Sequence, residues 1–560
     1  SVEITEPMRK VFAIDQTVTE MTPNELLKTI LQAPVDLIYN GGIGTYIKSS
    51  EETHDDVGDR ANDQIRVNGS QVRARVVGEG GNLGATQAGR VEAALNGVLI
   101  NMDAIDNSGG VDASDHEVNI KILIDTMLEE NLIAPEERTQ LLLSMTDEVA
   151  ELVLKTNVSQ NALLRLEEGL DAEWTPTLIR HTAWLEEHAG LDREQEALPS
   201  EEELRQRMEH GKGFVTPELA ILASYTKIQM MHDLLESEMV DDEWFNDWLY
   251  AYFPKTLQQR AGRTVFNHPL AREIIAMSVA NHVVDTGGIT TVFRAQEETG
   301  ADTHTVVESF LAGQWIYEIN EYREELDALP RSIDPEIRWE IGFRLRRLTD
   351  RITRWIIHHQ RADLTMQQRI SSYLEPVTEL IPEISGAFVG DTKRRFESDR
   401  DRLIEAGFEP QLAVRTSRMF EAYSLMDIVD LAARLDEDPK RVIGIFFALH
   451  DEFNVSYLLD LISGLSRETR WDSLSRASMR EELYSWLTEL TGEVLTTEGV
   501  QGRSPAEAVA HWESDHLRRV ARVRSFLTQI AEQFDAQTMH EDTDLAMMTV
   551  VLRRLRSLIL

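Results

Sequence analysis

The sequence predicts a mostly α-helical protein with a short α/β part at its N-terminal end. Two observations predict this fold class. In residues 1–132 short apolar runs alternate with helical segments, which is typical of a parallel sheet with crossover connections. From Pro135 onward one helical pattern follows another, without the fixed period of a repeat protein. We therefore expect an α/β domain over residues 1–132 and a helical domain over residues 133–560, whose length allows a division into two subdomains near residue 330.

The α/β part opens with a helix for which Thr22 is the expected N-cap, followed by Pro23 at the first helical position. The elements expected after this cap are helix Glu25–Leu31, strand Val35–Tyr39, strand Arg73–Val77, helix Gln87–Asn96 and strand Val98–Met102. Between the first two strands, residues 46–70 are polar and acidic, so a long exposed loop is expected there.

Each expected strand leads into a loop of glycine and asparagine. The three loops begin Asn40-Gly41-Gly42, Gly78-Glu79-Gly80-Gly81-Asn82 and Asn107-Ser108-Gly109. Ligands bind at the carboxyl ends of parallel strands, so three such loops on one edge favour a site for a flat ligand. The dinucleotide pattern G-x-G-x-x-G is incomplete, because Leu83 stands where its third glycine would be. A set of tight turns without a ligand therefore stays open as the alternative.

Ser114 has two expected roles. With Glu117 three residues later it forms a capping box ahead of a helix expected over residues 118–132. A serine at a helix N-terminus can also meet a carboxylate, because free N–H groups and a partial positive charge lie there.

Composition excludes several classes of protein. A net charge of -41 and a pI near 4.7 oppose binding to nucleic acid or to an anionic membrane. The absence of cysteine excludes disulfides and cysteine-ligated metals. No apolar run reaches the roughly 18 residues of a membrane span. The first residues lack the apolar core of a signal peptide, so a cytoplasmic protein is expected.

The three loops resemble the end of the coenzyme domain of glutamate dehydrogenases. Members of that family carry an A-E-G-A-N loop and an N-A-G-G-V loop that reaches a serine; residues 78–82 and 107–114 are similar to these. The resemblance is closest to the large bacterial NAD-specific family, since residues 215–220, 267–275 and 286–294 are similar to its C-terminal region. It implies that this chain holds the end of a Rossmann-type coenzyme domain.

The resemblance also implies roles for individual residues. Asn82 would meet the ribose on the nicotinamide side of NAD, and Asn107 the nicotinamide amide or the substrate. Ser114 would bind the distal carboxylate of L-glutamate and Val111 would line the substrate. Gly41, Gly42 and Gly80 would belong to the cofactor-binding loops.

By the same resemblance, the parent protein converts L-glutamate to 2-oxoglutarate with NAD and is a homo-oligomer, a tetramer or a hexamer. The catalytic lysine and aspartate are expected upstream of Ser1, in a larger polypeptide. No catalytic residue is expected in this chain, which would be inactive alone. The lysines of the α/β part do not lie in a glycine-rich setting; they are Lys10, Lys28, Lys48 and Lys121. A helical assembly module that binds no ligand of its own is the alternative.

The helical region raises two further questions. From Ile341 an apolar seam runs beside an arginine stripe made of Arg344, Arg347, Arg351 and Arg354. In a chain with 97 acidic residues, ion pairs within the protein are favoured over binding to RNA or phosphate. The histidines at 181, 188, 358 and 359 lack partners at ligand spacing, so no metal site is expected.

Overall fold

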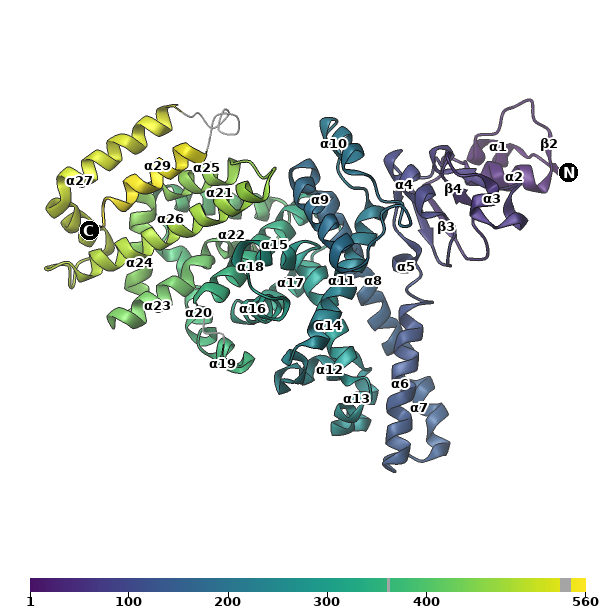
Figure 1. Ribbon diagram of the computed structural model, residues 1–560, viewed down its shortest axis with the longest axis horizontal. Helices are drawn as coiled ribbons and strands as arrows, with labels where there is room; N and C mark the ends of the chain where they lie inside the picture. The colour runs from purple at the N-terminus through teal and green to yellow at the C-terminus, as the bar shows by residue number, and fades with distance from the viewer. Residues whose placement is uncertain (360–362, 534–544, 560) are drawn as a thin grey trace. The chain divides into compact units, whose positions relative to one another are not determined.

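The computed structural model describes residues 1–359, 363–533 and 545–559, which fold as two compact units, Ser1–Thr290 and Thr291–Leu560 (Figure 1). The protein is mostly helical and carries a small α/β part near its N-terminus, as the sequence predicts. The expected domain boundaries near residues 132 and 330 stay predictions, because one compact unit can hold more than one domain.

The strands of the first unit form three small sheets. Their bounds are β1 (Val2–Glu3), β2 (Glu20–Met21), β3 (Leu37–Asn40), β4 (Ile47–Lys48), β5 (Val67–Asn68), β6 (Val76–Glu79) and β7 (Leu99–Ile100). Strands β3, β6 and β7 form a parallel sheet in the order β3-β6-β7, with Leu37, Val76 and Leu99 in register. This confirms the three expected strands, although β6 starts three residues later than expected. Strands β4 and β5 pair in parallel, and β1 and β2 are antiparallel.

The three-stranded sheet is covered on one face. Val77 and Ile100 are buried in the core of this part, which also contains Ala93 of helix α4 (Gln87–Leu95). The residues on the opposite face, Leu37, Val76 and Leu99, are 56%, 37% and 56% exposed. Parallel sheets are normally covered on both faces, so this apolar face is unusual.

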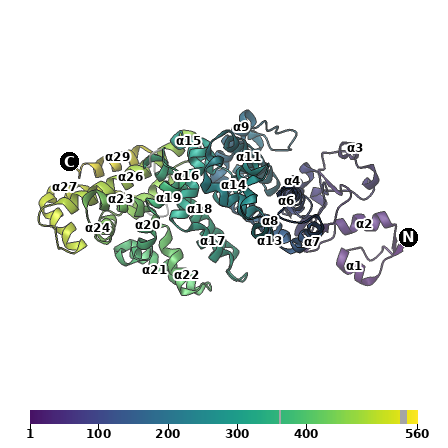
Figure 2. The ribbon, with the colours of Figure 1, turned by 90° about the horizontal axis from the view of Figure 1, so that it is seen from below.

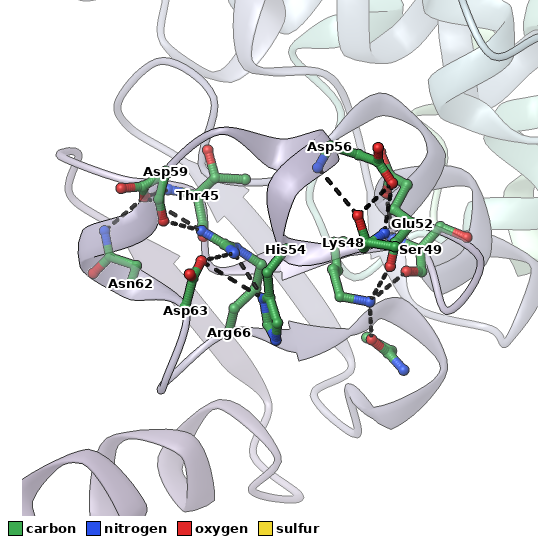
Figure 3. Close-up of polar contacts among 12 residues, drawn as sticks. Thr45, Lys48, Ser49, Glu52, His54, Asp56, Asp59, Asn62, Asp63 and Arg66 are labelled. Carbon is green, nitrogen blue, oxygen red and sulfur yellow. Dashed lines mark hydrogen bonds and ion pairs between the residues drawn. The ribbon is translucent and has the colours of Figure 1, made fainter.

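The prediction of an exposed loop over residues 46–70 is wrong. This segment contains β4, β5 and helix α3 (His54–Val57), and its centre is a buried guanidinium (Figure 3). Arg66 is 2% exposed, and it donates to the Thr45 carbonyl at 2.8 Å and to the Asp63 carboxylate at 2.7 Å. The polar residues of the segment thus form hydrogen bonds with one another around Arg66. Their polarity alone predicted that they would be exposed to solvent.

The rest of the first unit is helical. The remaining helices are α1 (Glu6–Phe12), α2 (Pro23–Leu31), α5 (Asp103–Asp106), α6 (Asp112–Glu129), α7 (Arg138–Ser144), α8 (Thr146–Glu168), α9 (Asp171–His188), α10 (Glu201–Glu209), α11 (Thr216–Glu236), α12 (Asn246–Tyr252), α13 (Lys255–Ala261) and α14 (Ala271–Gly287). The expected N-cap at Thr22 is confirmed and forms a capping box with Glu25, and a second capping box joins Ser200 to Glu203.

The capping box expected at Ser114 is wrong. Helix α6 starts at Asp112, and the N–H of Asp115 already donates to the carbonyl of Val111 at 3.1 Å. Ser114 therefore lies in the first turn of the helix rather than ahead of it. Its hydroxyl donates back to the Val111 carbonyl at 2.7 Å, which satisfies the serine without capping an N–H group.

The described secondary structure of the second unit consists of helices joined by turns and loops. Its helices are α15 (Thr291–Thr299), α16 (Thr303–Ile316), α17 (Ile319–Asp327), α18 (Pro335–His359), α19 (Met366–Ser371), α20 (Leu374–Leu380), α21 (Gly390–Glu405), α22 (Pro410–Met419), α23 (Leu425–Leu435), α24 (Pro439–Glu452), α25 (Val455–Gly464), α26 (Arg470–Thr496), α27 (Pro505–Gln533) and α29 (Leu545–Arg556). Helices α16 and α18 pack against each other (Figure 2). The apolar seam expected on α18 is buried, as predicted.

Members of the arginine stripe of α18 form ion pairs within the protein, as was favoured. Arg344 pairs with Asp399 at 2.7 Å, and Arg354 pairs with Glu298. The other two members stack on an aromatic ring, Arg347 at 5.3 Å and Arg351 at 4.3 Å from the centroid of Phe420. Cation–π contacts therefore add to the ion pairs that hold the stripe.

Within the described residues no single helix combines the length and apolarity needed to cross a membrane, while α24 and α25, bent by 64°, meet that test only as a pair.

Candidate functional site

The central loop of the site, residues 78–84, is held by a buried ion cluster. Glu79 is 1% exposed and accepts hydrogen bonds from Arg90, at 2.6 Å to Nε and 2.9 Å to Nη2. It also accepts the N–H of Ala85 at 3.0 Å, while Asp103 accepts the N–H of Leu83 at 2.7 Å. Burial raises the pKa of Glu79, and Arg90 opposes that rise. Two buried carboxylates and one guanidinium thus fix the backbone of the loop.

Glycine lets this loop approach its neighbours closely. A Cβ on Gly81 would lie 2.4 Å from the Cα of Gly42, so the first and second loops touch through backbone alone. A Cβ on Gly80 would lie 2.0 Å from the hydroxyl of Tyr39. Gly81 is therefore explained by a backbone contact within the protein, as the alternative of tight turns requires, whereas at Gly80 the exposed side chain of Tyr39 can move aside. Gly41 differs, because no atom lies within 4 Å of the position of its Cβ.

The second and third loops meet through their asparagines. The amide Nδ2 of Asn107 donates to Oδ1 of Asn82 at 2.7 Å, and this contact is exposed. The structure thus brings together Gly41, Gly42, Gly80, Asn82 and Asn107, the residues expected to bind a cofactor. The prediction of a ligand site at the strand ends requires this grouping.

The two residues expected to contact substrate lie further along the third loop. The N–H of Val111 donates to the carbonyl of Asn107 at 3.1 Å, and Ser114 bonds to the carbonyl of Val111. Both Val111 and Ser114 are exposed. They are therefore connected to Asn107 through the backbone of one loop and the first turn of α6.

Two bulky residues at this edge have a left-handed backbone. Ile43 has φ 59° and is 93% exposed, and Leu83 has φ 57° and is 63% exposed. This conformation costs roughly 1–2 kcal/mol for a residue with a Cβ. Such strain gathers at functional sites, where the surrounding structure must hold it. Leu83 occupies the position at which the dinucleotide pattern has its third glycine. The departure from this pattern therefore falls on a residue with a strained backbone.

Sequence reasoning missed the ion cluster of Glu79, Arg90 and Asp103. One feature could have revealed it. Arg90 lies in a stretch of small and apolar residues of α4, between Gly89 and Val91, where a charged side chain needs a buried partner.

Two of the lysines in the α/β part are engaged in contacts within the protein. Lys48 is buried, and its ammonium donates to the carbonyls of Ser49 and Glu52 and to Oδ1 of Asn68, at 2.9, 2.7 and 2.8 Å (Figure 3). These three bonds use all its N–H donors. Lys121 pairs with Glu117. Among the described residues no group of three or more His, Cys, Asp or Glu side chains is arranged to hold a metal ion.

Comparisons with known proteins agree over the whole chain. The family model "Glutamate dehydrogenase, C-terminal" matches residues 211–557, and "Bacterial NAD-glutamate dehydrogenase, catalytic domain" matches residues 1–167. The NAD-specific glutamate dehydrogenase of Mycobacterium tuberculosis is 40% identical over 99% of this chain and 34% of its own length. The enzymes of the same name from Halomonas elongata and Pseudomonas aeruginosa are 37% and 35% identical, over 95% and 100% of this chain and 33% and 34% of their own length. The chain thus spans about a third of the length of these curated relatives. It belongs to the NAD-specific glutamate dehydrogenase family.

Proposed function

We propose that residues 40–45, 78–84 and 107–114 form the nicotinamide- and substrate-facing edge of an NAD-dependent glutamate dehydrogenase with a Rossmann-type coenzyme domain. The proposed reaction converts L-glutamate, NAD⁺ and water to 2-oxoglutarate, ammonium, NADH and a proton. The hydrogen bond between Asn107 and Asn82 carries the proposal, because it joins two neighbouring strand ends at an exposed position. The name shared by the relatives supports the choice of cofactor and substrate.

The residues at this edge fit the nicotinamide half of the cofactor. Each asparagine amide offers both a donor and an acceptor, which suits ribose hydroxyls and a carboxamide. Asn82 would bind the ribose, and Asn107 the nicotinamide amide or the substrate. The open space beside Gly41 leaves room for a ligand to approach the backbone. When bound, NAD supplies the hydride acceptor, and the protein supplies orientation.

Ser114 and Val111 fit the distal end of glutamate. The Ser114 hydroxyl is exposed in the first turn of α6, where the partial positive charge of the helix N-terminus favours an anion. Its O–H would leave the Val111 carbonyl and donate to the substrate carboxylate. The half-exposed Val111 side chain would contact the methylenes of the substrate.

We further propose that this chain does not oxidise glutamate by itself. Deprotonation of the α-amino group needs a positioned base. Lys48 has used its donors, Lys121 is paired, and the uncovered face of the sheet formed by β3, β6 and β7 marks a missing layer. The base and the covering layer would come from polypeptide outside residues 1–560.

The test uses two proteins, the chain and a longer polypeptide that includes the upstream region of its relatives. Each is mixed with NAD and glutamate, and reduced nicotinamide is followed by absorbance. We expect no turnover from the chain and turnover from the longer protein. In the longer protein Asn82→Ala and Asn107→Ala should lower kcat/KM by about tenfold or more, the value of one lost hydrogen bond to a ligand.

Asn96→Ala is the matched control, since Asn96 is an exposed asparagine at the end of α4, away from the three loops. If Asn82→Ala and Asn107→Ala behave like this control, the loops are structural turns. The helical part would then be an assembly module that binds no ligand of its own, which is the competing function. Rapid turnover by the chain alone would place the catalytic base within residues 1–560.

We also propose that the parent protein is a homo-oligomer, a tetramer or a hexamer. Helix α8 exposes Leu154 and Val158, one turn apart, at 62% and 64%. Apolar side chains placed together on a surface mark contact sites. Multi-angle light scattering of the longer protein measures its subunit number, and a monomer at micromolar concentration would refute this proposal.

A further inference from the structure

We propose that a cavity in the second unit is a binding site for a small molecule that carries two or more phosphate or carboxylate groups. The cavity has a volume of about 650 Å³ and lies between helices α18, α21 and α22 and the turn over residues 421–424. This volume is in the range of small-molecule sites. Everything that lines it belongs to residues 291–560, so it is separate from the nicotinamide-facing edge.

Arginine dominates the wall of the cavity. Five of the lining residues are arginines: Arg344, Arg347, Arg394, Arg395 and Arg402. Only two lining residues are acidic, Asp399 and Glu421. The whole chain has the opposite balance, with 56 basic and 97 acidic residues. The cavity wall is therefore rich in guanidinium groups, several of which are paired with the carboxylates of Glu340, Asp391, Asp399 and Asp460.

The arginines come from two helices that face each other across the cavity. Arg344 and Arg347 lie on α18, and the other three lie on α21, whose cavity-facing residues recur at helical spacing. Asp399 bridges the helices, because it accepts from Arg344 at 2.7 Å and from Arg402 at 2.7 Å. This bridge holds two guanidinium groups beside one opening.

The ion pairs leave donors available to a ligand. Arg395 uses Nε toward Asp391 at 2.7 Å and one Nη toward Asp460 at 2.8 Å, and its other Nη has no bond among the described residues. Arg394 is 73% exposed and pairs with Asp391 through a single bond at 3.2 Å. A guanidinium carries five N–H donors in a planar fork that matches phosphate and carboxylate oxygens. Partial pairing fixes the arginines in place and still offers their outer edges.

Two other features of the wall suit an organic anion. The hydroxyl of Ser417 is buried and has no hydrogen-bond partner within the described chain. It can donate to a ligand oxygen, which would satisfy it. Phe396 and Phe420 also line the cavity, and Phe420 already carries the guanidinium of Arg347 on its ring. The rings give the carbon part of a ligand an apolar surface.

The test measures binding to the full 560-residue chain by isothermal titration calorimetry at constant ionic strength. Pyrophosphate is the probe in one arm and 1,2,3-propanetricarboxylate in the other, and sodium acetate serves as a monovalent control. We expect at least one multivalent probe to bind with a Kd below about 1 mM. Binding of pyrophosphate alone assigns a phosphate ligand, binding of the tricarboxylate alone assigns a carboxylate ligand, and binding of both supports the shared oxyanion chemistry.

Two variants locate the binding. Arg347→Gln and Arg394→Gln should each weaken it about tenfold or more, the value of a charge-assisted hydrogen bond. Arg394 is mostly exposed, so its replacement leaves folding intact. Arg400→Gln is the control, since Arg400 lies on the same helix, pairs with Asp401 and does not line the cavity. The proposal is overturned if neither probe binds, if the two variants bind as the unchanged chain does, or if Arg400→Gln weakens binding equally.

Discussion

Replacing Arg90 by methionine tests whether a buried ion cluster holds the site. Arg90 and Glu79 are 3% and 1% exposed, and two hydrogen bonds of 2.6 and 2.9 Å join them. Asp103 lies 3.3 Å from the same guanidinium. The substitution Arg90→Met keeps much of the side-chain volume but leaves two carboxylates buried without their cation. Breaking a buried pair in this way destabilises a protein by roughly 3–5 kcal/mol.

The double variant Glu79→Gln with Arg90→Met separates charge from packing. Removing both charges of a buried pair is often close to neutral, so the double variant should be more stable than Arg90→Met alone. Arg75→Met is the matched control: Arg75 pairs with Asp36 at 3.3 Å beside the same sheet, but the two side chains are 81% and 89% exposed. An exposed pair contributes roughly 0–1 kcal/mol.

Urea unfolding measures the free energies, and amide hydrogen exchange gives a local measurement. The N–H groups of Leu83 and Ala85 donate to Asp103 and Glu79, so both should exchange faster in Arg90→Met. A loss of stability no larger than that of Arg75→Met would refute the reasoning. So would a double variant as unstable as the sum of its two single changes, because no coupling would then exist between the charges.

Three further predictions concern single residues. Asp350→Ala should destabilise the second unit by roughly 3–5 kcal/mol in urea unfolding, because it removes the carboxylate that pairs with the buried Arg294. The control Asp401→Ala, at a 60% exposed position, should have little effect. Ser114→Ala should leave the melting temperature of the chain within about a degree, because it removes only a bond within its own helix turn, yet raise the KM for glutamate of the longer protein about tenfold to a hundredfold; unchanged kinetics would contradict the proposed role. Burial lowers the pKa of His181 from 6.5 to about 3, so the folded chain binds this proton more weakly than the unfolded chain. Stability should therefore be full above pH 6.5 and fall by about 1.4 kcal/mol per pH unit below it, and His181→Gln, measured by melting between pH 7 and 5, should flatten that dependence.

The parts of the site that follow from strand order were predictable from the sequence. Strand ends in a parallel sheet share an edge, so the meeting of Asn82 and Asn107 follows once the strands are recognised. The buried seam of α18 was likewise predictable, because helical spacing of apolar residues implies one covered face.

Other features depend on tertiary partners that local pattern does not contain. The folding of residues 46–70 rests on Arg66, whose carbonyl partner Thr45 lies 21 residues away in the sequence, too far to leave a periodic pattern. Ser114 and Glu117 are the residue types of a capping box. The turn from Asn107 to Val111 nevertheless starts α6 at Asp112, three residues before the start that an N-cap at Ser114 implies. Arg347 and Arg351 lie over the ring of Phe420, which belongs to another segment than α18, so the spacing of the arginines could not predict this contact. In each case a contact between segments overrides a local preference.

The half-covered sheet also bears on how the chain behaves in concentrated solution. Leu37, Val76 and Leu99 present an apolar surface that can adhere to another copy, while the net charge of -41 keeps copies apart. The range of that repulsion shrinks from about 30 Å in 0.01 M salt to about 3 Å in 1 M salt. The colloidal stability of this chain is therefore greatest in dilute buffer, and added salt turns repulsion between copies into attraction.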